Sequence, residues 1–346
     1  MPGPTMRSMP AMTRRDLLAG TAATSLAFGL GSRVALADTK NIVLAEPAHL
    51  YPYVPVYLAI DQGLFAKRGL NVSLIQATGG AHVAALVSGQ VWGNLGGVES
   101  DAMANNGKAD PIIGIVGFIN RALVYFCARK GTAPKSKAPA DIKAFFMGKK
   151  CALSRYGGTP DVLARTFMEE NGIDLAKDVT IINNANIGDG PALVKSGAAD
   201  IAIVTEPAVS SGIINGIFDQ PFFSFPSLGE YAFTAVSTKR STITNDPATV
   251  QLFVDAVVEA LHVTWTNRPL VEATLKKDFP TLPDDVAKMA LDRCYKDQLW
   301  SRDGLITPYG YDKDMTSVYK SGEMTRQVPY SDVVDMTFVT NANKRK

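Results

Sequence analysis

Residues that support metal, redox or disulfide chemistry are scarce in this chain of 346 residues, which has three cysteines and three histidines. Cys127, Cys151 and Cys294 stand far apart, at no spacing typical of a zinc site or a redox pair. Cys127 and Cys151 fall within short apolar runs typical of strands, so we expect buried free thiols rather than a disulfide. The sequence therefore predicts no metal site and no cofactor.

The chain also lacks an excess of one charge and the common motifs of catalysis. Its 35 lysines and arginines nearly balance 33 aspartates and glutamates, which gives a formal net charge of +2. A surface so close to neutral has no general attraction for nucleic acid or anionic lipid. There is no Gly-x-Ser-x-Gly elbow, no His-Glu-x-x-His pair and no Walker loop. We therefore expect neither a nucleic-acid-binding protein nor an enzyme.

The N-terminus has the three-part order of an export signal. The twin arginine Arg14-Arg15 precedes a stretch rich in Ala, Gly and Thr, residues 17–30, and an Ala-Leu-Ala motif ends at Ala37. The apolar stretch is too short for the roughly 20 residues that cross a bilayer. We predict that residues 1–37 are a Tat-type signal peptide, cleaved after Ala37, and that the mature protein is periplasmic. The alternative is a chance arginine pair ahead of an Ala-rich helix.

Short apolar runs alternate with amphipathic stretches from residue 41 onward, which is typical of βαβ units and a mainly parallel sheet. The predicted strands are residues 41–46, 71–76, 93–97, 112–118, 123–129, 150–153, 179–183, 201–204 and 231–237. A linker rich in Lys, Pro and Ala, residues 131–139, follows the fifth strand, and the pattern after residue 247 is helical. We expect a second lobe, residues 131–232, inserted into a first lobe formed by residues 38–130 and 233–346.

The two halves repeat one plan. Residues 72–99 and residues 179–206 each run through a strand, a glycine-bearing loop, a helix that ends in Ser-Gly, a short strand and a glutamate. Two lobes of similar topology would produce this repeat, although βαβ alternation by itself produces a weaker version of it.

Several motifs in order resemble one family. The motifs are residues 57–72 (YLAIDQGLFAKRGLNV), residues 85–90 (ALVSGQ), Gly157-Gly158-Thr159, residues 196–200 (SGAAD) and Glu206-Pro207. Together they resemble the NMT1/THI5-like and taurine/sulfonate/nitrate-type solute-binding proteins over about residues 42–215. The chain departs from the family pattern at Trp92, where Asp is usual, and in the loop at residues 96–99, which lacks a common proline.

This resemblance implies an α/β periplasmic-binding-protein type II fold. Each of its two lobes would be a doubly wound, mainly parallel sheet with flanking helices, and crossover strands would form a hinge. The ligand would lie in the cleft between the lobes.

Ligands of open α/β sheets lie beyond the carboxyl ends of the strands, where loops and helix N-termini meet. In the first lobe this rule places His49, Tyr51, Tyr53, Thr78, Gly79, Gly97, Val98 and Glu99 at the cleft. In the second lobe it places Ser154, Arg155, Tyr156, Gly158, Thr159, Asn186 and Glu206 there. His82 is interpreted as a helix-surface residue.

The segment at residues 154–159 is the strongest polar feature of this set. Its glycines would let backbone N–H groups approach a ligand, and the helix that follows adds about half a positive charge at its N-terminus. Arg155 would complete a clamp for an anion. We expect Thr159 to be the N-cap of this helix and Pro160 its first residue. The alternative is a plain capped helix start with Arg155 in solvent.

The remaining candidates each have a second interpretation. Tyr51, Tyr53 and Tyr156 would sandwich a planar or methylene-bearing ligand, or would pack in the core or at its rim. Glu99 and Glu206 would bind a ligand ammonium or an aminopyrimidine edge, or would cap the helices that follow them. We favour capping for Glu206 because Pro207 makes it a helix-start position.

The resemblance implies the function as well. The chain would be the periplasmic solute-binding component of an ABC importer, a monomer that delivers its ligand to a membrane permease with its ATPase. The ligand would be a small polar or anionic organic molecule, such as a sulfonate or taurine, a pyrimidine vitamin precursor or an aromatic carboxylate. One alternative is a periplasmic ligand sensor, and another is an enzyme that resembles the family's pyrimidine-precursor synthase.

Overall fold

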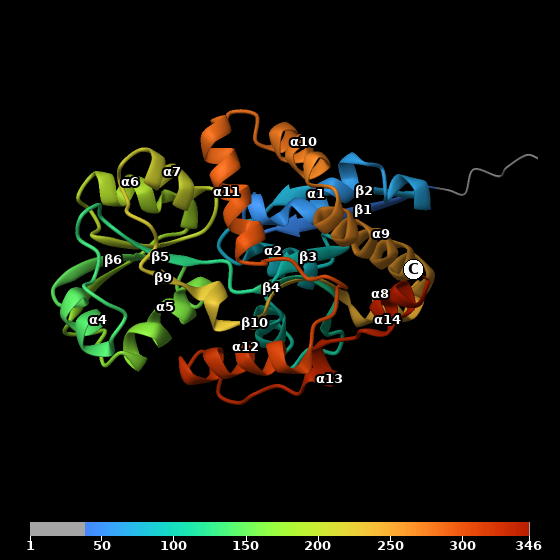
Figure 1. Ribbon diagram of the computed structural model, residues 1–346. Coiled ribbons are helices and arrows are strands. Elements are labelled where there is room, and N and C mark those ends of the chain that lie inside the picture. The colour runs from blue at the N-terminus through green and yellow to red at the C-terminus, as the bar shows by residue number, and fades with distance from the viewer. Residues whose placement is uncertain (1–38, 346) are drawn as a thin grey trace, which may run out of the picture. The chain divides into compact units, whose positions relative to one another are not determined.

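The computed structural model describes residues 39–345, which form two lobes, each built on a five-stranded sheet (Figure 1). This confirms the predicted two-lobed α/β fold. The predicted signal peptide lies outside the described residues. No helix in the described part of the chain is long and apolar enough to cross a membrane.

The sheet of the first lobe has the strand order β2 (Leu70–Gln76), β1 (Lys40–Glu46), β3 (Gly93–Gly96), β10 (Glu230–Lys239), β4 (Ile112–Arg121). Strand β1 pairs in parallel with β2 and β3, and β10 runs antiparallel to both of its neighbours. The helices between the first four strands are α1 (Val54–Asp61), α2 (Ala81–Val87) and α3 (Val98–Ala104). Strands β3, β4 and β10 are almost wholly buried because helices pack against them.

The sheet of the second lobe has the strand order β7 (Val179–Asn183), β6 (Lys149–Leu153), β8 (Ile201–Val204), β5 (Tyr125–Ala128), β9 (Phe223–Ser224). Strand β6 is parallel to β7 and β8, and β5 is antiparallel to β8 and β9. The helices of this lobe are α4 (Pro139–Phe146), α5 (Thr159–Glu170), α6 (Gly190–Lys195) and α7 (Ala208–Ile214). The two sheets therefore share one plan, three parallel strands followed by an antiparallel one, as the sequence repeat indicates.

Two neighbouring crossovers join the lobes. The chain passes from β4 to β5 through residues 122–124 and returns from β9 to β10 through a short 3-10 turn, Phe225–Leu228. Because β5 pairs within the second sheet, the chain changes sheets before residue 130, where the sequence analysis divided the lobes. An apolar run shows that a strand is present and does not show which sheet it joins.

The C-terminal helices cover the first lobe and also contact the second. They are α8 (Arg240–Asn245), α9 (Pro247–Thr266), α10 (Arg268–Asp278), α11 (Asp284–Lys296), α12 (Pro308–Lys320), α13 (Tyr330–Val333) and α14 (Thr337–Lys344). Helix α9 packs on α1 and β4, whereas α11 packs on α7 and α12 packs on both β10 and α5. Helices α11 and α12 therefore bridge the lobes, which goes beyond the prediction that these helices cover the first lobe alone.

The core of the second lobe is rich in aromatic rings. The Phe126 ring lies within 5.7 Å, centroid to centroid, of Phe146, Phe222 and Phe225. Burial of each such side chain is worth about 1.5–3 kcal/mol, so this cluster fixes α4 and the β9 region on the sheet. The three cysteines are free and buried, as expected for Cys127 and Cys151.

Candidate functional site

A cavity of about 130 Å³ lies between the lobes, beyond the carboxyl ends of strands from both sheets. Its first-lobe lining consists of Pro47, Ala48, Leu50, Tyr53, Gly79, Gly80, His82, Gly96, Gly97, Ser100, Phe233 and Thr234. Its second-lobe and crossover lining consists of Leu123, Ser154, Arg155, Gly158, Thr159, Pro160, Ala185, Ile187 and Thr205. The lining combines hydroxyl and backbone polar groups with aliphatic and aromatic side chains. The cavity therefore suits a ligand that has a polar and an apolar part.

The N-terminus of α5 forms the polar wall on the second-lobe side. Gly158 is the N-cap, with extended backbone angles (φ −82°, ψ 153°), and the helix begins at Thr159. The prediction that Thr159 is the N-cap was therefore wrong by one residue. Because the first-turn N–H groups of a helix have no intrahelical partner, this end of α5 carries partial positive charge toward the cavity.

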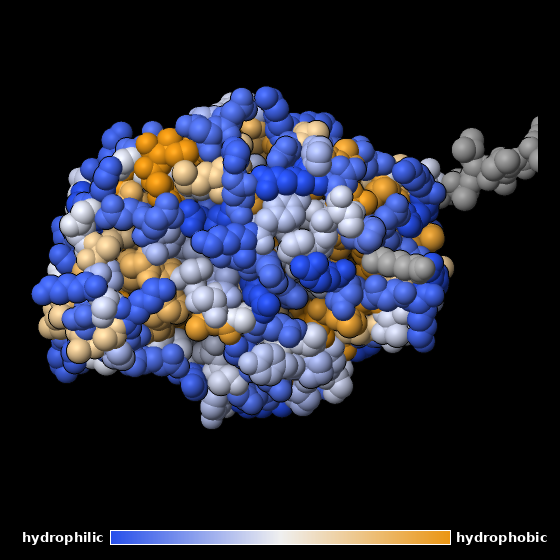
Figure 2. All heavy atoms as spheres, viewed as in Figure 1, coloured by the Kyte–Doolittle hydropathy of each residue, from blue (hydrophilic) through white to orange (hydrophobic). Residues whose placement is uncertain are grey.

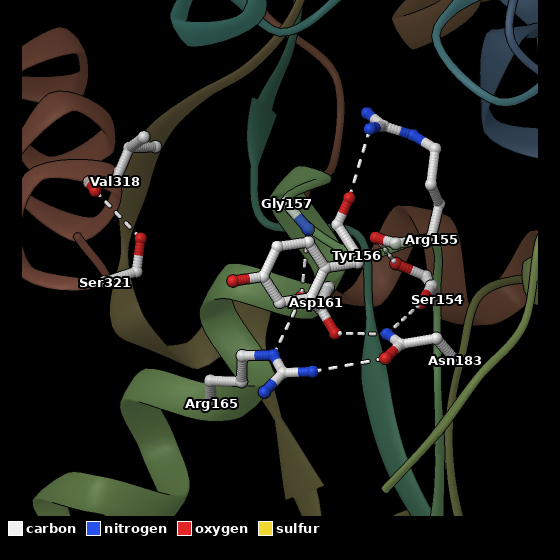
Figure 3. Close-up of polar contacts among 9 residues, drawn as sticks. All are labelled: Ser154, Arg155, Tyr156, Gly157, Asp161, Arg165, Asn183, Val318 and Ser321. Carbon is white, nitrogen blue, oxygen red and sulfur yellow. Dashed lines mark hydrogen bonds and ion pairs between the residues drawn. The ribbon is translucent and has the colours of Figure 1, made fainter. Parts of the chain in front are cut away.

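The loop before α5 is braced from behind by Asp161 (Figure 3). This side chain is buried, and it accepts hydrogen bonds from the Gly157 amide (3.1 Å), the Asn183 side-chain amide (2.9 Å) and the Arg165 guanidinium (2.8 Å). Asn183 also donates to the Ser154 carbonyl at 2.9 Å. Arg165 offsets the negative charge of Asp161, so the bracing does not cancel the positive potential of the helix N-terminus.

Arg155 extends from this loop toward the first lobe. Its guanidinium donates to the Tyr156 carbonyl at 3.1 Å, and its side chain points away from the Asp161 cluster (Figure 3). A Cβ atom built on Gly80, across the cleft, would lie 3.9 Å from Arg155 Cζ. The guanidinium therefore reaches first-lobe backbone, and among residues 39–345 it has no salt-bridge partner.

His82 faces Arg155 from the second position of α2. It is buried, and its Nδ1 has no hydrogen-bond partner among the described residues. Burial, and after it the nearby Arg155 charge, lowers the pKa of His82 to about 4. The ring is therefore neutral near pH 7 and offers a ligand one donor or acceptor without adding charge. A Cβ on Gly96 would lie 3.1 Å from Nε2, so a glycine at this position leaves room for the ring.

A carboxyl group behind Gly97 joins the two lobes. Glu99, in the first turn of α3, accepts a hydrogen bond from the Thr159 hydroxyl of the second lobe and another from Ser100 (3.2 Å). Burial, together with the neighbouring Glu99 carboxylate, raises the pKa of Asp314 on α12 well above its usual range. This shift favours the protonated form of Asp314, whereas Glu99 is the acceptor for the Thr159 hydroxyl. A Cβ on Gly97 would overlap the Glu99 carboxylate, so a larger residue at this position would displace that carboxylate.

The structure brings about half of the sequence-predicted residues to the cavity. The predicted residues that line it are Tyr53, Gly79, Gly97, Ser154, Arg155, Gly158 and Thr159. The predicted residues outside its lining are His49, Tyr51, Thr78, Val98, Glu99, Tyr156, Asn186 and Glu206. Contact with a ligand stays a prediction for the first set, and the second set has other roles in the structure.

In the first lobe, these other roles are mostly packing. His49 stacks between Tyr57 and Phe279 with centroids 4.6 Å from each, and its Nδ1 lies 2.9 Å from Glu46. The hydrogen bond with Glu46 is the main cause that raises the pKa of His49. Tyr51 is buried and donates to the Ala287 carbonyl of α11. Val98 belongs to the core, and Thr78 is exposed.

In the second lobe, the residues outside the lining have surface or interface roles. Tyr156 is 59% exposed, and the Arg165 guanidinium lies 5.0 Å from its ring centroid. Asn186 caps a short 3-10 turn by accepting from the Gly188 amide. Glu206 accepts from the Ser210 amide and hydroxyl and from Arg293 of α11 (2.7 Å). Glu206 is thus committed to the start of α7 and to a bridge between the lobes, in keeping with the capping interpretation.

Sequence reasoning missed His82 and the hydroxyls of Ser100, Thr205 and Thr234, which line the cavity. Thr205 directly follows β8, whereas His82 and Ser100 lie in the first turns of α2 and α3, the helices that follow β2 and β3, so the same positional rule reaches these three residues. His82 directly follows Gly79-Gly80-Ala81, and this glycine pair before a helix was the available signal. Within residues 39–345, no group of three or more His, Cys, Asp or Glu side chains is placed to hold a metal ion.

Comparisons with known proteins bear on this architecture. The family model described as "NMT1/THI5 like" matches residues 52–268. Among curated proteins, the "Putative binding protein YtlA" of Bacillus subtilis is 24% identical over 315 residues, which cover 88% of this chain and 91% of that protein.

Two solved structures share the fold. The alkanesulfonate-binding protein SsuA from Xanthomonas axonopodis pv. citri, bound to MOPS, has a TM-score of 0.68 at 15% identity, over 87% of this chain and 100% of that chain. The periplasmic nitrate-binding protein NrtA from Synechocystis PCC 6803 has a TM-score of 0.70 at 16% identity, over 89% of each chain. At these identities the likeness shows the fold alone. Because the family model covers more than half of the sequence, the chain belongs to the NMT1/THI5-like family.

Proposed function

We propose that this protein is the exported solute-binding component of an ABC importer and that its ligand is a small organic anion held between the lobes. One observation carries the proposal. Arg155 and the N-terminus of α5 converge on a cavity whose opposite wall holds the neutral ring of His82. Positive charge on one side faces uncharged donors and acceptors on the other.

The charge of the cavity favours an anion. Arg155 is the ionised side chain of the lining, and the partial charge of the α5 N-terminus has the same sign. His82 adds no charge near pH 7, and the carboxylate of Glu99 is engaged by the Thr159 and Ser100 hydroxyls. A sulfonate or carboxylate oxygen would accept hydrogen bonds from Arg155, from Ser154 and from free backbone N–H groups.

The size of the cavity favours a compact ligand. Its volume of about 130 Å³ equals roughly four water molecules of the liquid. Leu50, Leu123 and Phe233 would contact a short apolar portion. Taurine and short alkanesulfonates are compact acids of this kind. The names of the two solved relatives support an anion, since one binds alkanesulfonates and the other nitrate.

The partners in this proposal are a membrane permease and its ATPase. The support is the architecture, two lobes joined by two crossovers around a small ligand cavity, together with the binding roles in the names of the two solved relatives. No residue of the cavity is proposed as catalytic.

Mass spectrometry of small molecules that co-purify with the protein, followed by calorimetric titration of the emptied protein, tests the ligand class. Taurine, butanesulfonate, benzoate and a neutral aminopyrimidine form a suitable panel. We expect binding of the sulfonates that weakens with salt, and no binding of the neutral heterocycle. Tight, salt-independent binding of the aminopyrimidine would contradict the proposed anion clamp.

Export by the Tat route is the part of the proposal that concerns residues 1–37. Replacing Arg14-Arg15 with Lys-Lys should leave the precursor in the cytoplasm, because the twin arginine is the feature that the Tat route reads. Cell fractionation measures this directly. Efficient export of the Lys-Lys variant would indicate a different route.

A further inference from the structure

A second and larger cavity, of about 570 Å³, lies between the second lobe and α12. We name it the α5–α12 chamber. It lies at the end of α5 opposite to the cleft, where Thr166, Phe167 and Glu170 contribute to its lining. Its volume falls within the range of about 300–1,000 Å³ typical of small-molecule sites.

The walls of the α5–α12 chamber are aromatic and aliphatic. Phe167, Phe223 and Phe225 form a contiguous group, with centroids 4.3 Å apart for Phe167 and Phe223 and 4.9 Å apart for Phe223 and Phe225. The other apolar or aromatic residues of the lining are Ile142, Leu163, Leu228, Tyr231 and Tyr309. Figure 2 shows apolar surface among hydrophilic residues over this part of the second lobe. These rings are preorganised to contact an apolar body.

The rim of the chamber carries more positive than negative charge. Lys137, Lys313 and Lys320 line it, against Glu170 and Asp312. Lys320 pairs with Glu170 at 3.7 Å in an exposed position, an interaction of little strength, and Lys137 is exposed. Deeper in the wall, the Thr166 hydroxyl oxygen is buried and has no hydrogen-bond partner among residues 39–345. An apolar cavity with a cationic rim is complementary to a molecule that has an acidic head and an apolar body.

From this arrangement we infer that the α5–α12 chamber is a second binding site, for an amphipathic organic acid such as a medium-chain carboxylate. The acyl chain lies against Phe167 and Phe223, which Phe225 supports from behind, and the acid group lies at the rim beside Lys137 and Lys320. This site differs from the cleft in size, polarity and lining, and it does not depend on the function proposed for the cleft.

Displacement of 8-anilinonaphthalene-1-sulfonate fluorescence from the full chain by hexanoate, octanoate and decanoate tests the inference. Each buried CH₂ group should raise affinity about fourfold, so decanoate should bind roughly 15-fold more tightly than octanoate. Decanol and decyltrimethylammonium, which have similar chains without the negative charge, should displace the probe less well than decanoate.

Two variants locate the site. The double reversal Lys137→Glu with Lys320→Glu should weaken decanoate by about 5- to 20-fold, because two rim cations become anions. Thr316→Trp, on the α12 side of the lining, should narrow the chamber and lower decanoate affinity at least tenfold. The matched control Lys288→Glu changes a lysine that is 74% exposed on α11, outside the lining, and should alter affinity less than twofold.

The inference is overturned if decanoate displaces no probe, or if decyltrimethylammonium displaces it as well as decanoate does. It is also overturned if the double reversal binds decanoate like the Lys288→Glu control. Taurine or butanesulfonate should not compete with decanoate, and this independence separates the chamber from the cleft proposal.

Discussion

The two ends of α5 differ in almost every property that governs binding. Its N-terminus lies in a cavity of about 130 Å³ beside Arg155 and the neutral His82, and its C-terminal turn lies in a chamber of about 570 Å³ among phenylalanines. Charge and hydrogen bonds would dominate at the first end, and contact area would dominate at the second. Affinity at the cleft should therefore depend on salt and single polar atoms, and affinity at the chamber should depend on chain length.

The largest expected effect concerns the neutral state of His82. Its pKa is about 4 in the folded protein and about 6.5 in an unfolded chain, so the unfolded state binds more protons between these values. The contribution of His82 to stability is therefore present above about pH 6.5 and is lost as the pH falls to about 4, by about 3 kcal/mol in total.

His82→Gln removes this titration. The difference in unfolding free energy between wild type and His82→Gln, measured by urea unfolding, should shrink by about 3 kcal/mol from pH 7.5 to pH 4. Any loss of stability that the substitution causes equally at both pH values cancels when the differences at pH 7.5 and pH 4 are compared. A difference that stays the same at every pH would show that His82 titrates normally and is not held neutral in the cleft.

Arg155→Ala should have the next largest effect. It should weaken ligand binding and leave the stability of the folded protein nearly unchanged. A charged hydrogen bond is worth about 1.5–3 kcal/mol, so affinity for the cleft ligand should fall about 10- to 150-fold. The melting temperature of the empty protein should hardly change, since Arg155 has no ion pair within the described chain. Arg326→Ala, an exposed arginine outside the cleft lining, is the control. If Arg155→Ala binds the cleft ligand with unchanged affinity, backbone and hydroxyl groups and not Arg155 recognise the ligand.

Thr159→Val tests the contact between the lobes. The substitution removes the hydroxyl that donates a hydrogen bond to Glu99 across the cleft, and it keeps the side-chain volume. Loss of one hydrogen bond is worth about 1 kcal/mol, so the affinity for the cleft ligand should fall about fivefold. Thr159→Ser restores the hydroxyl and should recover most of the affinity. If both variants bind alike in calorimetry, the hydrogen bond between Thr159 and Glu99 does not support the bound form.

Tyr156→Ala should have the smallest effect. The side chain is 59% exposed and lies outside the cleft lining, and its contact with Arg165 is worth about 0.5–1 kcal/mol at most. Cleft affinity should change less than twofold. A loss of cleft affinity above tenfold would indicate that Tyr156 contacts the ligand, as the sequence analysis predicted.

The sequence predicted the fold well because its strands and helices have strong periodic patterns. The run at residues 179–183 coincides with β7, and the helical pattern predicted after residue 247 begins with α9. The helix expected after Glu206-Pro207 is α7, although Ala208–Ile214 contains two serines and a glycine, which favour turns when no tertiary contacts are considered. Packing on α11 and the Glu206 hydrogen bonds to Ser210 stabilise it as a helix.

The site was predicted less well, because the rule for α/β sheets gives the position of a loop and not the direction of each side chain. Tyr51 and Tyr53 are two residues apart, yet Tyr53 lines the cavity and Tyr51 points to Ala287 of α11. His82 was assigned to the helix surface, although α2 turns it toward Gly96. These directions depend on contacts between residues far apart in the sequence, which local patterns do not contain.

The most direct test of the account is a crystal structure of the protein with the ligand identified by mass spectrometry. We predict that the acidic group of the ligand lies within hydrogen-bond distance of Arg155 and the N-terminus of α5, with His82 on the opposite side. A ligand in the cleft whose uncharged end faces Arg155, or a ligand found in the α5–α12 chamber with the cleft empty, would contradict it.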